Sequence, residues 1–247
     1  MVRFRGDGTF TVVQFADIHW RNGDELDRRS AALMGEILDA EQPDLVIFDG
    51  DVLYGAGCKD ADQAWREAVA PAVERGLAWA AVFGNHDDEG DRSRAELMAL
   101  QRTLPGCLSQ PGPVTLSGVG NYVIPIFSAT RDEVAAYLYC LDSHAYARNG
   151  VGGYGWIERD QIAWYLETAR DLRARHGKTL PALAFFHIPL PEFNEVWDLH
   201  PCRGVKGEPI CCPLLNSGFF AALYEGGDVM GVFVGHEIGR ASCRERV

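Results

Sequence analysis

The sequence predicts an α/β fold in which one domain contains two layers of β-structure. Its 247 residues are enough for one large domain with a full hydrophobic core. Between residues 9 and 104, short apolar runs alternate with longer amphipathic segments, which is typical of parallel strands joined by crossover helices. Two neighbouring strand-like runs at 122–127 and 134–141 then resemble a β-meander and indicate the second layer.

The N-terminal half contains three predicted strands and three predicted helices. Residues 9–15 (TFTVVQF) are β-branched and apolar, which favours a strand. Apolar residues recur at helical spacing in 26–40, and Pro43 ends that helix. The other predicted elements are strand 45–48, helix 60–74, strand 77–83 and helix 93–104, which opens with Ser93 as N-cap.

The C-terminal half supplies the second β-layer and its helices. Residues 108–121 are rich in Gly, Pro and Ser and are expected to form loops. Segment 156–175 carries apolar residues on one face and predicts a long helix. The remaining predicted elements are strands 183–186 and 229–234, a loop at 201–212 and a short helix at 217–224. The sequence shows no repeat and no low-complexity linker, so we expect residues 1–236 to form a single domain.

Composition limits the classes of function. The net charge of −12 argues against a nucleic-acid partner, because binding a phosphate backbone requires a basic face. No apolar run approaches the ~18 residues of a membrane span, so we expect no membrane partner. The first residues lack the apolar core of a signal peptide, which favours a cytoplasmic protein. The cysteines form no CxxC pair, which disfavours a zinc knuckle.

Side chains that can bind a metal follow five of the predicted strands. They are Asp17 and His19, then Asp51, then Asn85, His86 and Asp87, then His187, and finally His236. Because ligand sites lie beyond the carboxyl ends of parallel strands, these side chains can converge on one rim. Carboxylate, imidazole and amide groups suit a metal such as Mn, Fe or Zn, and one carboxylate can bridge two metals about 3.5–4 Å apart.

Each motif alone also has a structural interpretation. The tripeptide at 17–19 and the Gly-Asp at 50–51 are common in loops and turns, and a lone His187 is more often structural. The Gly-Asn-His-Asp sequence at 84–87 is more specific, although Asn85 could be a left-handed turn residue. The order of the motifs, each at a strand end, favours the metal interpretation.

The pattern Asp-x-His, Gly-Asp, Gly-Asn-His-Asp, His, Gly-His resembles the calcineurin-like metallophosphoesterase superfamily over nearly the whole chain. Segments at 120–122, 141–143, 154–157 and 186–193 resemble its branch of purple-acid-phosphatase-29-like plant proteins and their fungal relatives. The resemblance implies two mixed β-sheets packed as a sandwich and flanked by helices. It also implies a phosphatase or phosphodiesterase whose substrate is a phosphorylated small molecule or a phosphoprotein.

The resemblance further implies roles for the motif residues. The first metal would be bound by Asp17 and His19, both metals would be bridged by Asp51, and the second would be completed by Asn85, His187 and His236. The ions would be divalent or trivalent Mn, Fe or Zn, and a metal-bridging hydroxide would attack the phosphorus. His86, supported by Asp87, would stabilise or protonate the leaving oxygen.

Tyr54 is an alternative ligand. True purple acid phosphatases use Asp-x-x-Tyr, whose phenolate binds ferric iron, and Asp51-Val52-Leu53-Tyr54 fits that spacing. Those enzymes lack the His of Asp-x-His, whereas His19 is present here. We therefore expect His19 to be the ligand and Tyr54 to be a packing or rim residue.

The last residues depart from the family pattern. The family ends with Gly-His-x-His, whose second His binds the first metal, but here position 238 is Ile238. The string EIGRASCRERV at 237–247 matches the in-frame translation of a common sequencing adapter, so we expect a non-native tail and the loss of C-terminal strands from the second sheet. As written, the chain would bind its first metal weakly. The alternative function is therefore that of a catalytically impaired relative with a binding or scaffold role.

Overall fold

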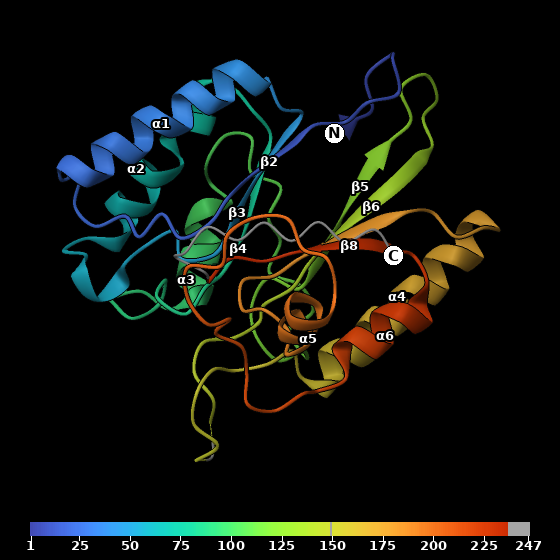
Figure 1. Ribbon diagram of the computed structural model, residues 1–247. Helices are drawn as coiled ribbons and strands as arrows, with labels where there is room; N and C mark the ends of the chain where they lie inside the picture. Colours follow the sequence, from blue (N-terminus) through green and yellow to red (C-terminus); the bar gives the residue numbers. More distant parts are fainter. Residues whose placement is uncertain (149, 237–247) are drawn as a thin grey trace.

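The computed structural model describes residues 1–148 and 150–236, and their strands form two sheets (Figure 1). The first sheet has the order β2 (Val12–Phe15), β3 (Leu45–Asp49), β4 (Trp79–Val82), and both strand pairs are parallel. The second sheet has the order β1 (Val2–Arg3), β5 (Tyr122–Phe127), β6 (Val134–Cys140), β7 (Ala182–Phe185), β8 (Val229–Phe233). Only the β5–β6 pair is antiparallel, so the second sheet is mixed, while the first is parallel throughout its described strands.

Helices cover the outer face of each sheet (Figure 1). Beside the first sheet lie α1 (Glu25–Glu41), α2 (Ala61–Glu74) and α3 (Arg94–Gln101), with the short 3₁₀-helix η1 (Gly55–Gly57) before α2. Beside the second lie α4 (Arg159–His176) and α6 (Phe219–Gly226), while α5 (Glu192–Leu199) follows β7. Helices α1 and α3 both begin with a capping box, which pairs backbone N–H groups that the first turn leaves free.

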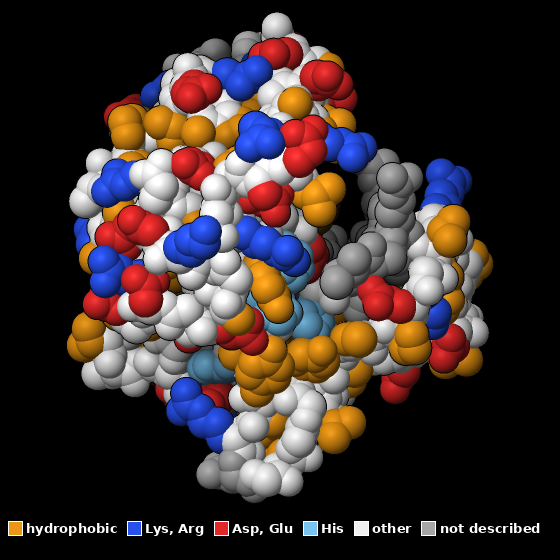
Figure 2. Space-filling model, turned by 90° about the vertical axis from the view of Figure 1, so that its left-hand side faces the viewer, with side chains coloured by type: hydrophobic (Ala, Val, Ile, Leu, Met, Phe, Trp, Pro, Cys, Tyr) orange, Lys and Arg blue, Asp and Glu red, His pale blue; other side chains and the backbone are white. Residues whose placement is uncertain are grey.

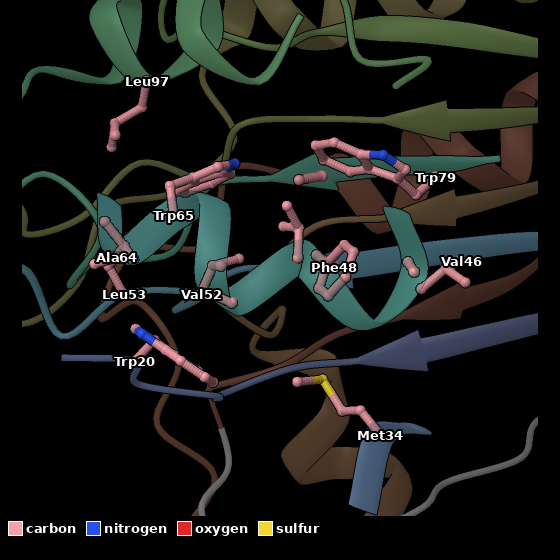
Figure 3. Close-up of a cluster of buried hydrophobic side chains, with 14 of the residues drawn as sticks. Trp20, Met34, Val46, Phe48, Val52, Leu53, Ala64, Trp65, Trp79 and Leu97 are labelled. Carbon is pink, nitrogen blue, oxygen red and sulfur yellow. The ribbon is translucent and has the colours of Figure 1, made fainter. Parts of the chain in front are cut away.

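Three hydrophobic clusters hold these layers together. One lies between the first sheet and helices α1 to α3 and contains Trp65 and Phe48 (Figure 3). Another joins the second sheet to α4 and α6 around Tyr165. The third lies between the two sheets and includes residues of β3 and β4 together with residues of β1, β5, β6 and β7. The fold is therefore the predicted two-sheet sandwich flanked by helices, with the correction that the first sheet is parallel rather than mixed in its described strands.

Strand β3 takes part in two of these clusters. All five of its residues are buried. Leu45 and Ile47 face the cluster between the sheets, whereas Val46 and Phe48 face the helices, as the two-residue period of a strand requires. Full burial of such a side chain contributes about 1.5–3 kcal/mol, so this strand fixes both layers in place. Its end, where Asp51 follows, is correspondingly well fixed.

The predicted elements are confirmed with shifted ends, and three described elements were not predicted, among them the three-residue η1. Strand β1 spans only two residues, too few for a pattern. Helix α5 follows Pro191, spans only eight residues and has no fully buried residue, so its short apolar pattern was not recognised as a helix. In the described residues no helix is long and apolar enough to cross a bilayer. The predicted non-native tail, residues 237–247, lies outside the described residues, and the single-domain assignment stays a prediction.

Candidate metal centre

The structure brings most of the predicted ligands together at the carboxyl ends of the strands. Two groups of potential metal-binding atoms each lie within 4.8 Å of one another: the open group (His19, Asp51 and His86) and the buried group (Asp51, His187 and His236). Asp51 belongs to both groups, which is the arrangement a bridging carboxylate requires. Figure 2 shows histidine side chains (pale blue) gathered at the surface beside hydrophobic and basic side chains.

Asp17 and Asn85 complete the predicted set. Asp17 Oδ1 lies 3.8 Å from His19 Nε2 and 3.9 Å from His187 Nε2, so this carboxylate sits between the two groups. Asn85 is buried, and its amide nitrogen lies 3.4 Å from the hydroxyl of Tyr146. That contact leaves the amide oxygen of Asn85 for another partner. All of these side chains are in place, and their role as metal ligands stays a prediction.

Unpaired atoms at this site fit a metal. Four buried ligand atoms have no hydrogen-bond partner in the part of the chain that the structure describes: His19 Nε2, Asn85 Oδ1, His187 Nε2 and His236 Nε2. Each unpaired buried polar atom costs about 1–3 kcal/mol. His187 Nε2 does lie 3.2 Å from Asp51 Oδ2, but as an ion pair without hydrogen-bond alignment. Imidazole nitrogens and an amide oxygen beside two carboxylates form a donor set that suits Mn, Fe or Zn.

A backbone contact orients His187. Its ring is fully buried, and Nδ1 lies 2.8 Å from the carbonyl oxygen of Asp49. Because a carbonyl can only accept, Nδ1–H must donate, which leaves Nε2 as the atom free to bind a metal. The backbone carbonyl of Asp49, at the end of β3, thus fixes the tautomer of His187.

Several predicted ligands have an uncommon backbone conformation. Positive φ angles occur at Asp17 (56°), His19 (53°), Asp51 (47°) and His236 (67°). Residues other than glycine adopt this left-handed region rarely, and holding them there costs of order 1–3 kcal/mol each. Backbone hydrogen bonds from Asp17 N to Gly50 O (3.1 Å) and from His19 N to Asp51 O (2.9 Å) hold two of them. Such strain concentrates at functional sites.

The glycines in two motifs are required by close contacts. A Cβ on Gly50 would overlap the ring of His187 at Nδ1. A Cβ on Gly84 would overlap Oδ1 of Asp51. These glycines therefore leave the space that a ligand from a neighbouring loop occupies, which explains why Gly precedes Asp in one motif and Asn-His in the other.

Asp87 does not occupy the position predicted for it. Its buried carboxylate accepts the backbone N–H groups of Gly84 (2.7 Å), Leu53 (2.8 Å) and Asp51 (3.1 Å). Burial, together with the charge of Asp51, raises the pKa of Asp87 to about 6. These bonds fasten the loop after β3 to the loop after β4. The predicted support of the His86 ring by Asp87 is therefore wrong, because this carboxylate is used by the backbone.

Glu89 lies where Asp87 was expected. Its Oε2 is 2.6 Å from Nδ1 of His86, and its Oε1 accepts the hydroxyl of Tyr146 at 2.9 Å. Sequence reasoning missed both residues. The spacing of three between His86 and Glu89 was a usable signal, because a turn brings such positions together, but nothing in the sequence indicates Tyr146.

Burial and charge set the protonation of the buried group. Burial opposes the charge on Asp51 and on His187, but their mutual attraction outweighs it, lowering the pKa of Asp51 to about 2 and raising that of His187 to about 9. Burial and the neighbouring positive charge of His187 lower the pKa of His236 to about 4. A metal ion would replace the proton on His187.

Tyr54 packs against the open group. Its ring centroid lies 6.2 Å from that of His19 and 5.6 Å from that of His86, and the guanidinium of Arg21 lies 4.9 Å above it. This is the location expected of a packing or rim residue.

Two further tyrosines lie beside the candidate ligands. The rings of Tyr146 and Tyr154 stack with centroids 6.0 Å apart, and the rings of Tyr154 and His236 meet edge to face with centroids 4.2 Å apart. The loop that carries them therefore contacts His236, which follows the second sheet, and through Tyr146 also Asn85, which follows the first sheet.

Comparisons with known proteins agree with this geometry. Residues 10–239 match the family described as calcineurin-like phosphoesterase. "Probable inactive purple acid phosphatase 14" of Arabidopsis thaliana is 34% identical over 278 residues, 99% of this chain and 69% of the relative. "Probable inactive purple acid phosphatase 29" of the same plant is 34% identical over 274 residues, 99% of this chain and 70% of the relative. "Phosphatase DCR2" of Saccharomyces cerevisiae is 36% identical over 239 residues, 85% of this chain and 41% of the relative.

The predicted resemblance is thereby confirmed, both for the superfamily and for its purple-acid-phosphatase-like relatives. The family is one of metal-dependent phosphoester hydrolases, which accords with the unpaired ligand atoms at the strand ends. From its sequence match and its two-sheet fold, this chain belongs to the calcineurin-like phosphoesterase family.

Proposed function

We propose that the chain hydrolyses phosphoesters at a centre of two metal ions. The residues that would hold them are Asp17, His19 and Asp51 for the first ion, and Asp51, Asn85, His187 and His236 for the second. The observation that carries this proposal is that Asp51 is shared by two groups of potential ligands, among which buried histidine nitrogens have no partner in the described residues. Family membership supports metal-dependent hydrolysis.

Besides the metal ligands, the proposed reaction needs a proton donor for the leaving group, and His86 is the candidate. When bound, the metals supply an activated water and neutralise charge that develops on the phosphoryl oxygens. His86 is 27% exposed at its side chain, and its backbone N–H donates to Asp51 Oδ1 at 2.8 Å, so its loop is anchored while its ring stays accessible. We assign to it the donation of a proton to the leaving oxygen, a step worth about 10²–10⁴ in rate.

The substrate is proposed to be a phosphorylated small molecule or a phosphoprotein in the cytoplasm. Such a centre recognises the phosphoryl group rather than what it is attached to. The net charge of −12 disfavours a nucleic acid. The yeast relative is named a phosphatase, which favours a monoester over a diester as substrate.

The first test combines metal content with turnover. The purified chain, loaded with Mn, Zn or Fe, is expected to bind two ions and to hydrolyse 4-nitrophenyl phosphate. His86→Ala should retain both ions and lose turnover by about 10²-fold or more. If the loaded chain holds two ions and hydrolyses neither this monoester nor bis(4-nitrophenyl) phosphate, the hydrolase proposal fails.

The second candidate is a binding or scaffold protein on the same fold. Two observations favour it: the Arabidopsis relatives carry the word "inactive" in their names, and position 238 is Ile where the family has His. Retention of two tightly held ions together with turnover would exclude it.

A further inference from the structure

We propose that Glu89 is a positioning residue that orients His86 as the proton donor to the leaving group. This inference rests on the proposed hydrolase function and names the carboxylate that orients the proposed proton donor, His86. His86 Nδ1 and Glu89 Oε2 are 2.6 Å apart, a distance typical of a strong, charge-assisted hydrogen bond. The pair is half-buried, since the two side chains are 27% and 25% exposed.

The backbone holds this pair in register. Glu89 N faces the carbonyl of His86 at 3.5 Å, so the two residues are the ends of one turn. The N–H of Gly55 in η1 donates to the same carbonyl at 2.9 Å. A Cβ on Gly90 would lie 2.7 Å from the oxygen of Gly55, so the turn is pressed against η1. The carboxylate therefore meets the ring because of the fold, not through a flexible surface contact.

Both oxygens of Glu89 are used. Oε1 accepts the hydroxyl of Tyr146 at 2.9 Å, and that hydroxyl lies 3.4 Å from the amide nitrogen of Asn85. A chain of contacts thus runs from the ring of His86 to a predicted metal ligand. It keeps the carboxylate from rotating away and ties the position of the acid to that of the second metal's ligands.

The ring nitrogen of His86 that can donate a proton to the substrate is determined by which nitrogen is hydrogen-bonded to Glu89. With Nδ1–H donated to Glu89, the proton available for transfer lies on Nε2 of the imidazolium. In the proposed step a hydroxide oxygen from the activated water bonds to phosphorus as the bond between phosphorus and the leaving oxygen breaks. The electron pair of the broken bond stays on the leaving oxygen, and the proton leaves Nε2 to form the new O–H bond. The ring is then neutral and keeps Nδ1–H on Glu89.

The neighbouring carboxylates cannot replace Glu89 in this role. Asp87 accepts three backbone N–H groups, and Oδ1 of Asp51 accepts the backbone N–H of His86. The competing assignment is that His86 is itself a ligand, since it belongs to the open group. Metal content separates these possibilities. If Glu89 only orients His86 as the proton donor, Glu89 can be changed without loss of a metal ion.

The experiment compares substrates with good and poor leaving groups. Glu89→Gln, which keeps the shape but removes the charge, is measured with 2,4-dinitrophenyl phosphate and with phenyl phosphate. We expect kcat to fall about 10–100-fold for phenyl phosphate and less than about threefold for the dinitrophenyl ester, whose leaving group needs no proton. KM and metal content should not change. Glu89→Asp should fall between the wild type and Gln, and Glu225→Gln, an exposed change on α6, serves as the matched control.

Equal losses for both esters, or loss of a metal ion, would overturn the proposal. A readout that does not need activity is the imidazole NMR spectrum of the ¹⁵N-labelled, zinc-loaded chain, with His86 assigned from a His86→Gln variant. We expect a downfield Nδ1 proton in the wild type that moves upfield in Glu89→Gln. If the wild type has no turnover but shows this signal, the hydrolase function fails while the contact stands. If the signal is unaffected by Glu89→Gln, the positioning role is wrong whatever the activity.

Discussion

The open and buried groups of the centre differ in origin and in exposure. All members of the open group come from loops that follow strands of the first sheet, and the rings of His19 and His86 are 23% and 27% exposed. The buried group joins the two sheets, and His187 within it is fully buried. A substrate can therefore reach the first group, whereas the second group is also part of the contact between the sheets.

Changing Asp51, the residue that both groups share, should affect both proposed metal ions at once. Asp51→Asn keeps the shape that accepts the His86 N–H but removes the charge common to both groups. We expect both ions to bind more weakly and turnover to fall on the order of 10³-fold, because the charge stabilisation is lost. Elemental analysis and 4-nitrophenyl phosphate assays measure this. If one ion stays bound at full occupancy, Asp51 does not bridge.

The two histidines should respond differently when stability is measured. His187→Ala leaves a cavity between the sheets and unpairs Asp51, so we expect the metal-free chain to lose about 2–5 kcal/mol of unfolding free energy. His19→Ala, at a more exposed position, should cost less than about 1 kcal/mol while still weakening metal binding. Urea unfolding in the presence of a chelator tests this. Equal losses would contradict the proposed difference between the groups.

The affinity for metal should rise with pH, and the pKa of His187 in the buried group should set the pH range of that rise. The pKa of His187 is raised to about 9 by Asp51, so its pairing stabilises the metal-free fold fully below pH ~6.5, and this contribution is lost as pH rises through about 9. A metal must displace that proton, so the zinc association constant should increase up to about tenfold per pH unit between 6.5 and 9 and then level off. Competition with a chromophoric chelator measures it. The increase should vanish in His187→Ala, and its persistence there would assign the proton to another group.

The smallest expected effect concerns the first metal. Ile238→His restores the Gly-His-x-His pattern, and we expect tighter binding of one ion with little change in the other. Position 238 lies outside the described residues, so this prediction comes from the sequence pattern. Titration with zinc should show a second, stronger binding phase. An unchanged titration would mean that the open group does not depend on that position.

The sequence predicted which side chains converge at the candidate centre better than it predicted what supports them. Asp51 and His187 follow buried strands, whose apolar runs are local signals, and Gly50 adds a second signal before Asp51. The supports depend on contacts between distant residues: Tyr146 reaches Asn85 across 61 positions. Asp87 illustrates the limit, since the motif shows that a carboxylate is present but not that three backbone N–H groups take its oxygens. Helix α5 was missed because it is short and none of its residues is fully buried.

The most direct test of the central claim is a crystal structure of the chain soaked with manganese, with anomalous diffraction used to locate the ions. We expect two peaks about 3.5–4 Å apart, both within bonding distance of the Asp51 carboxylate, with Nε2 of His19 beside one and Nε2 of His187 beside the other. A single peak, or two peaks of which only one touches Asp51, would contradict the shared-carboxylate centre.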